Sequence, residues 1–126
     1  MDAALNLAAR ILMSQIFILS GFGKITGYAG TQQYMTAMGV PGALLPLVIL
    51  TELGGGLLLL AGFKTRWAAL ALAGFTLLAA VIFHRNFADQ MQMINFLKNL
   101  AIAGGLLLFV RHGAGAPSID TKLGKP

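Results

Sequence analysis

Cysteine is absent from the 126-residue chain, and acidic residues are scarce, with four aspartates and glutamates in all. Without cysteine the chain forms no disulfide, offers no thiolate nucleophile and supplies no sulfur ligand to a metal or cluster. The cysteine count therefore leaves the redox compartment undecided. Charged residues make up only 10% of the chain, whereas 57% of its residues are hydrophobic. That balance is typical of a membrane protein.

Basic residues outnumber acidic ones and give a formal net charge of +5. A nucleic-acid interface would need them on one solvated face with aromatic residues between them. Here they lie at the ends of apolar runs, where they orient a protein beside anionic lipid headgroups. We therefore expect contact with a lipid bilayer and no nucleic-acid partner.

Four apolar stretches are long enough to cross a bilayer, which takes roughly 17 to 25 helical residues. They cover about residues 8–25, 43–62, 67–83 and 94–110, and a short basic tail follows at 111–126. Asp2 weakens a reading of the first stretch as a cleaved secretory signal, so we expect a retained helix. The sequence predicts an all-α, integral membrane four-helix bundle of up-down antiparallel spans, in a single domain over residues 1–126.

Basic residues also predict the orientation of the spans. Four spans place both termini on one side, and that side carries most of the basic residues: Arg10, Lys64, Arg66, Arg111, Lys122 and Lys125. By the positive-inside rule we expect both termini in the cytoplasm. The short turn at 64–66 then makes the second and third spans an antiparallel hairpin.

The longest connection, residues 26–42, lies on the outer face in this topology. Thr31 is a candidate cap for a short helix that carries Tyr34 and Met35 and ends at Gly39. This outer interfacial segment is either a lid over a site or a helix resting on the headgroups with no ligand beneath it.

One glutamate, Glu52, lies inside the uncharged second stretch. A charged side chain there costs about 2.5 to 3.5 kcal/mol on insertion scales, so it needs a partner or a proton. It lies about nine residues deep, on the order of 14 Å at 1.5 Å per residue, close to the midplane. We predict Lys98 as its first partner and Lys24 as its second.

The fourth stretch carries polar residues among apolar neighbours. At 100° per residue Gln92, Asn95 and Asn99 share a stripe with Lys98 beside it, and this arc does not suit lipid. Together with Glu52 and Lys24 these residues form either a ligand-binding pocket or a structural network that fixes helix packing. His84 lies at the outer end of the third stretch, at the pocket mouth or simply at headgroup level.

Small residues indicate where helices pack closely. Gly21 lies on the first span, and Gly55 and Gly56 follow Glu52 at i+3 and i+4 on its own side of the helix. They admit a neighbouring backbone or a flat ligand near the carboxylate. We find no nucleophile–base pair. We also expect no metal site, because a membrane thickness separates the two histidines.

Three motifs resemble the DoxX family of small bacterial inner-membrane proteins: RILMSQIFILSGFGKITGYAG, TELGGGLLLLAGFKTRWAAL and NFLKNLAIAGGLLLF. The resemblance covers about residues 10–108, and the loop TGYAGTQQYMTAMGVPG looks like that of one enterobacterial member. It implies a four-helix protein of the bacterial inner membrane, with family positions at Gly21, Lys24, Glu52, Gly55, Gly56, Lys98 and Asn99. Members are often labelled quinol oxidase or oxidoreductase subunits.

The leading hypothesis is a subunit of a membrane redox system that binds a quinone or similar small ligand near Glu52. It would not be an enzyme alone, since no covalently bound cofactor is expected and electrons would come from a redox partner protein. The alternative is a non-enzymatic accessory protein whose buried polar network is only structural. A transporter or channel would require a homo-oligomer, because four short helices enclose little space.

Overall fold

A computed structural model describes residues 2–84 and 86–124 of the chain. Four of its helical stretches are long and apolar enough to cross a membrane: α1 (Asp2–Thr26), a composite span over Gly42–Ala61, α5 (Thr65–Phe83) and α6 (Gln90–His112). The predicted all-α fold with four spans is therefore confirmed. Three spans are longer than predicted, since α1 already begins at Asp2, α5 at Thr65 and α6 at Gln90.

The composite span changes helix type along its length. It opens with a 3₁₀ turn (Gly42–Leu44), continues as α3 (Leu45–Ile49), passes through a π-helical turn (Leu50–Gly54) and ends as α4 (Gly55–Ala61). Proline is tolerated in a first helical turn, and Pro46 occupies that position in α3. Gly62 ends α4 with a left-handed φ of 70°, which glycine adopts without steric cost.

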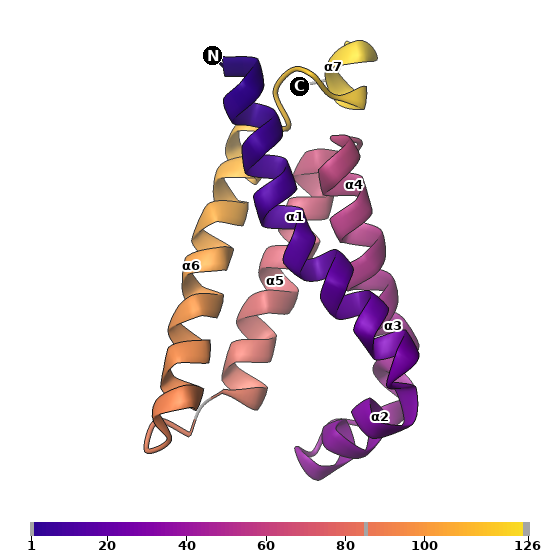
Figure 1. The fold of residues 1–126 in the computed structure, drawn as a ribbon, viewed down its shortest axis with the longest axis vertical. Coiled ribbons are helices and arrows are strands. Elements are labelled where there is room, and N and C mark those ends of the chain that lie inside the picture. The colour runs from indigo at the N-terminus through magenta and orange to yellow at the C-terminus, as the bar shows by residue number, and fades with distance from the viewer. Residues whose placement is uncertain (1, 85, 125–126) are drawn as a thin grey trace.

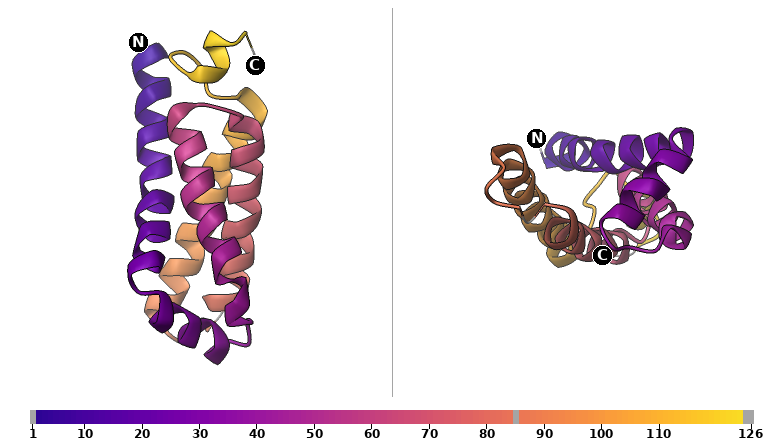
Figure 2. Two further views of the ribbon diagram at one scale, coloured as in Figure 1. Left: turned by 90° about the vertical axis from the view of Figure 1, so that its right-hand side faces the viewer. Right: turned by 90° about the horizontal axis from the view of Figure 1, so that it is seen from below.

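The spans form an open bundle rather than a closed one. α1 packs against the composite span, the composite span against α5, and α5 most extensively against α6. α1 and α6 touch each other little, so the seam between them stays open. Both chain ends lie at the same end of the bundle, which we call the terminal end (Figures 1 and 2).

The buried hydrophobic core lies mainly in the terminal half of the bundle. It joins one aromatic residue of α1 to aliphatic residues of the other spans, namely Phe17, Leu59, Ala69, Leu72, Ala73 and Leu106. Leucines such as Leu12 and Leu50 are exposed along the spans. Because apolar side chains are stable in hydrocarbon, this outer surface suits a lipid environment.

The C-terminal segment folds back over the terminal end. Its short helix α7 (Ile119–Lys122) places Asp120 against the turn between α4 and α5. The Asp120 carboxylate accepts hydrogen bonds from the backbone N–H groups of Lys64 and Thr65, at 2.8 and 3.0 Å. The side chain of Arg10 donates to the carbonyl of Pro117. These contacts tie α1, the α4–α5 turn and the C-terminal segment together.

The opposite end carries α2 (Tyr28–Ala37), which crosses beneath the spans (Figure 1). The predicted short helix is thus present, but Thr31 is not its cap. α2 begins three residues earlier, and the Thr31 hydroxyl donates back to the Gly27 carbonyl at 2.9 Å. The chain passes from α1 to α2 with only Gly27 between the two helices.

Candidate functional site

Glu52 lies in the π-helical turn of the composite span and is 4% exposed. Its Oε1 lies 2.5 Å from the Lys24 Nζ, which also donates to the Ser20 Oγ at 2.7 Å. Ser20 and Lys24 are four residues apart on α1, so both face the composite span. π-Helical turns are rare and occur frequently at functional sites.

Two glycines bring the helices close enough for this ion pair to form. A Cβ on Gly21 would lie 2.9 Å from the backbone nitrogen of Leu53. A Cβ on Gly56 would lie 2.9 Å from the side chain of Ile18. Such distances leave no room for a side chain, so α1 and the composite span meet nearly backbone to backbone on the terminal side of the ion pair. Gly55 instead faces the side chain of Leu72 on α5.

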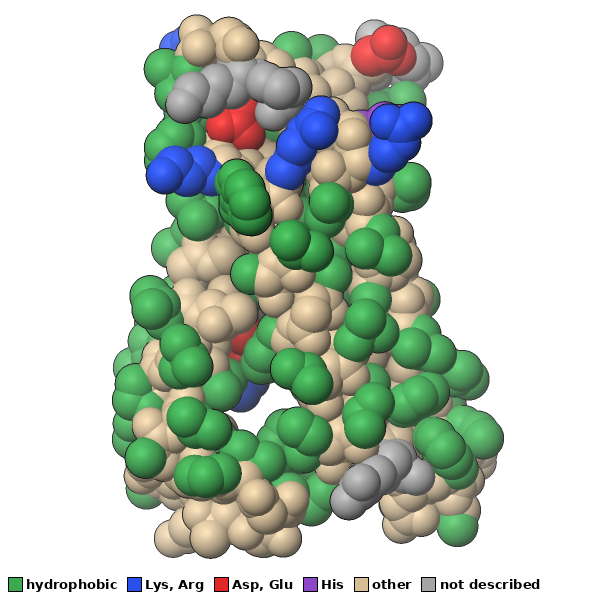
Figure 3. Space-filling model, turned by 180° about the vertical axis from the view of Figure 1, so that it is seen from behind, with side chains coloured by type: hydrophobic (Ala, Val, Ile, Leu, Met, Phe, Trp, Pro, Cys, Tyr) green, Lys and Arg blue, Asp and Glu red, His purple; other side chains and the backbone are tan. Residues whose placement is uncertain are grey.

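The ion pair forms part of the wall of a cavity of about 440 Å³. The cavity lies toward the α2 end, between α1, the composite span and α5, and Asn99 and Ile102 of α6 also line it. Its lining is mostly apolar, with a few polar side chains: Ser20, Lys24, Thr31, Tyr34, Glu52, Thr76, His84 and Asn99. Figure 3 shows the cavity from behind as an opening in the lower half of the molecule, among hydrophobic side chains.

α2 closes the cavity from the end opposite the termini. Met35 is 3% exposed, and the Tyr34 ring stacks on Phe83 of α5 with centroids 5.5 Å apart. The Gln32 Nε2 donates to the Gly42 carbonyl at 3.1 Å, which holds α2 to the start of the composite span. The sequence left open whether this segment covers a site or only rests on the headgroups. In the structure a cavity lies beneath it.

The prediction that Lys98 is the first partner of Glu52 is wrong. The structure pairs the carboxylate with Lys24, the partner predicted second. α6 turns the stripe of Asn99, Ala103 and Leu106 inward, and the Asn99 Nδ2 donates to the Thr76 carbonyl at 3.2 Å. Lys98 lies 100° around the helix from Asn99 and is therefore exposed. The deep packing of α6 against α5, and not against the composite span, explains the error.

The remaining predicted residues divide between the cavity and its surroundings. His84 lines the cavity, and its Nδ1 lies 3.4 Å from the Gln92 Oε1. Asn95 is partly buried on α6 but is not among the residues that line the cavity. Ser20 and Thr76 were missed by sequence reasoning. The spacing of Ser20 to Lys24 signals its position, whereas Thr76 is an isolated hydroxyl in an apolar helix.

The arrangement has the general features of a small-ligand site. Ligand sites are concave, mostly apolar and carry a few convergent polar groups, and their volumes are typically about 300 to 1,000 Å³. The cavity meets each criterion, with one acid and one base on the same wall. No cluster of metal-ligating side chains occurs among residues 2–84 and 86–124.

The fold and this cavity define a class, the small four-span membrane proteins with a buried ion pair. The family model of DoxX matches residues 5–85, and the chain belongs to the DoxX family. It is 63% identical over 119 residues to the inner membrane protein YqjF of Escherichia coli (strain K12), covering 94% of this chain and 92% of YqjF. The similarity to one enterobacterial member is thereby confirmed.

Two further relatives extend the comparison. The inner membrane protein YphA of Escherichia coli (strain K12) is 41% identical over 125 residues, covering 94% of this chain and 89% of YphA. CatD of Bacillus subtilis (strain 168), named as a candidate oxidoreductase, is 33% identical over 77 residues, covering 61% of this chain and 57% of CatD. No solved structure matches the chain.

Proposed function

We propose that the chain is the ligand-binding subunit of a membrane oxidoreductase system and that it binds the head of a quinone at the Lys24–Glu52 cavity. The observation that carries this proposal is an acid and a base, 2.5 Å apart, on the wall of an apolar cavity in a membrane-embedded bundle. Ionisable residues inside a membrane are costly and usually functional. The name of CatD, a relative at 33% identity, points to the same class of chemistry.

The polar groups of the cavity match the chemistry of a quinone head. Its two carbonyl oxygens accept hydrogen bonds, which the Lys24 ammonium and the Asn99 amide are able to donate. Reduction of a quinone to a quinol takes two electrons and two protons. In the ion pair the proton is held by the Lys24 ammonium, which the Glu52 carboxylate keeps in place and which is positioned to give a proton to a carbonyl oxygen. Water would restore that proton and supply the second one. The ring is flat and apolar, and the side chains of Val48, Phe75 and Ile82 give the cavity apolar walls. A redox partner protein would supply the electrons.

A bacterial inner-membrane location with cytoplasmic termini belongs to the same proposal. YqjF and YphA are both named inner membrane proteins. Basic side chains gather at the terminal end, visible in blue at the top of Figure 3. Because the chain has no cysteine, one introduced at Lys122 or Gln33 would be the only thiol in the protein. A membrane-impermeant maleimide should label Q33C in intact cells and K122C only after lysis; the reverse pattern would contradict this orientation.

Equilibrium binding of a tailless benzoquinone to the purified protein tests the proposed ligand. Glu52→Gln keeps the size of the side chain but removes its charge, and should weaken binding at least tenfold, equivalent to about 1.4 kcal/mol. Lys98→Gln is the matched control, since it removes an exposed lysine outside the cavity and should leave binding unchanged. Absence of binding to the parent protein, or equal binding by Glu52→Gln, would contradict the proposal.

The second candidate is an accessory membrane protein in which the ion pair only fixes helix packing. The close approach of Gly21 to Leu53 favours it, because the pair also joins two tightly packed helices. Buried polar groups specify packing partners in some proteins. On this account Glu52→Gln lowers thermal stability in detergent, and no quinone analogue changes that stability in either protein.

A further inference from the structure

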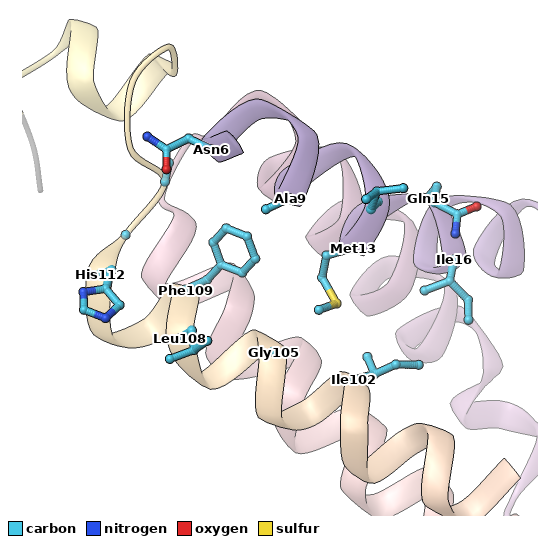
Figure 4. Close-up of a pocket in the computed structure, with 13 residues that line it drawn as sticks. Asn6, Ala9, Met13, Gln15, Ile16, Ile102, Gly105, Leu108, Phe109 and His112 are labelled. Carbon is cyan, nitrogen blue, oxygen red and sulfur yellow. The ribbon is translucent and has the colours of Figure 1, made fainter. Parts of the chain in front are cut away.

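A second cavity lies in the open seam between α1 and α6, toward the terminal end. Its volume is about 580 Å³, and α1 and α6 line it together with the residues that follow α6. In Figure 4 the side chains of Met13 and Phe109 project into the space between the two helices. Its lining is largely apolar, and its polar side chains are Asn6, Gln15 and His112.

The two cavities meet at a pair of isoleucines. Ile16 of α1 and Ile102 of α6 line both the cavity of the ion pair and the seam cavity. One residue comes from each side of the seam, so the two cavities adjoin at this pair of side chains. The cavity of the ion pair thus has an apolar groove as its neighbour along the bundle.

We infer that the two cavities form one site for a single-chain amphiphile, whose head binds at Lys24 and Glu52 and whose hydrocarbon tail passes between Ile16 and Ile102 into the seam. This inference rests on the proposed function, because it takes the quinone head as given and assigns the place of the tail. From Ser20 to Asn6, α1 spans fourteen residues, or about 21 Å at 1.5 Å per residue. The site therefore suits a long tail.

The charges of the site select a neutral head. Lys24 is already paired with Glu52, so the two groups together carry no net charge. An anionic head, such as that of a fatty acid, would compete with Glu52 for Lys24 and leave a buried carboxylate without its partner, which is costly. An uncharged head with carbonyl oxygens leaves the ion pair intact.

We expect the tail to add little to the affinity of the ligand, although it occupies a defined place in the groove. Hydrocarbon gains little by moving from lipid into an apolar groove, because lipid tails are as apolar as leucine side chains. A comparison of affinities for short-tailed and long-tailed ligands would therefore miss the groove. The informative measurement is the place where the end of the tail lies.

Photocrosslinking of the full chain in lipid nanodiscs measures that place. The probe is a benzoquinone carrying a hexadecyl chain that ends in a diazirine, and mass spectrometry maps the labelled residues. We expect labels on Met13, Ile102 and Phe109, which line the seam cavity and are partly buried, reduced at least fivefold by an excess of tailless benzoquinone. Glu52→Gln should reduce the same labels.

Neighbouring glycines of α6 provide a matched pair of variants. Gly105 lines the seam cavity, where an added side chain would meet the flexible end of Met13, whereas Gly104 has open space around it. Gly105→Phe should fill the groove and reduce its labelling severalfold, and Gly104→Phe should leave it unchanged. Binding of the tailless benzoquinone should be equal in the two variants.

Two outcomes would overturn the inference. Labels spread over lipid-facing residues such as Leu57 and Leu78, with Glu52-dependent binding of the tailless compound intact, would refute the tail site and leave the proposed function standing. Groove labels that persist with excess tailless compound and in Glu52→Gln would show a groove filled with hydrocarbon independently of the head. If the tailless compound also failed to bind the parent protein, the proposed function would fall as well.

Discussion

The two ends of the bundle use buried charge in different ways. At the terminal end, Asp120 and Arg10 hydrogen-bond to backbone groups and hold the C-terminal segment against the spans. Toward the α2 end, Lys24 and Glu52 bind each other on the wall of a cavity. The charged groups at the terminal end hold parts of the chain together, whereas those toward the α2 end are also accessible to a ligand. Variants at the two ends should therefore differ in what they change.

The largest expected effect is on the ion pair itself. Lys24→Met leaves the Glu52 carboxylate buried without its partner, and breaking buried pairs in this way costs roughly 3 to 5 kcal/mol. We expect the lower limit or less, because the Lys24 side chain is 26% exposed. The double variant Lys24→Met/Glu52→Gln removes both charges and should regain much of the loss in denaturant unfolding in detergent. A double variant less stable than Lys24→Met would contradict this account.

Close helix packing beside the ion pair should come next in size. Gly21→Leu forces a side chain against the Leu53 backbone, and overpacking typically costs about 1 to 3 kcal/mol. Gly23→Leu is the control on the same helix, because nothing lies near a Cβ at that position. Thermal unfolding should show a loss for Gly21→Leu alone. Equal losses in both variants would contradict the packing account, because leucine has the higher helix propensity and Gly23→Leu meets no neighbouring atom.

The terminal end should respond with a smaller loss and no change in ligand binding. Asp120→Ala removes the acceptor for two backbone N–H groups at the start of α5, and loss of such a cap costs about 0.5 to 2 kcal/mol. Binding of tailless benzoquinone should be unchanged at a temperature where the variant is folded. Reduced affinity in Asp120→Ala would show that the two ends are coupled and would break the comparison.

The smallest effect is expected at Lys98, the partner that sequence reasoning placed first. Its side chain is exposed on α6, so Lys98→Gln should change neither the unfolding transition nor quinone binding. Lys24→Gln, measured beside it, should change both. A destabilised Lys98→Gln would indicate an interaction of this lysine that the structure does not contain.

Much of the fold follows from the sequence, because span length and hydropathy are local properties of the chain. The four spans, the short helix after the first span and the hairpin at residues 64–66 all follow from apolar runs and glycine positions. No motif or composition signal indicates that residues 113–124 fold back onto the terminal end. That contact depends on a backbone turn exposing the N–H groups of Lys64 and Thr65, which composition does not reveal.

The sequence predicts the central residue of the candidate site but not the arrangement of the residues around it. A lone glutamate in an apolar run identifies Glu52, since an unpaired charge there is costly. The choice between Lys24 and Lys98 depended on which helices pack side by side, and helical periodicity gives only the face of each helix. Periodicity also does not reveal the π-helical turn at Leu50–Gly54 or the open seam between α1 and α6.

A structure of the protein in lipid nanodiscs with added long-tailed benzoquinone tests the central claim most directly. The account predicts density for a flat head in the cavity, with a carbonyl oxygen within hydrogen-bond distance of the Lys24 Nζ. Continuous density should then lead between Ile16 and Ile102. A cavity closed by its own side chains around the Lys24–Glu52 pair, at saturating quinone, would contradict the account.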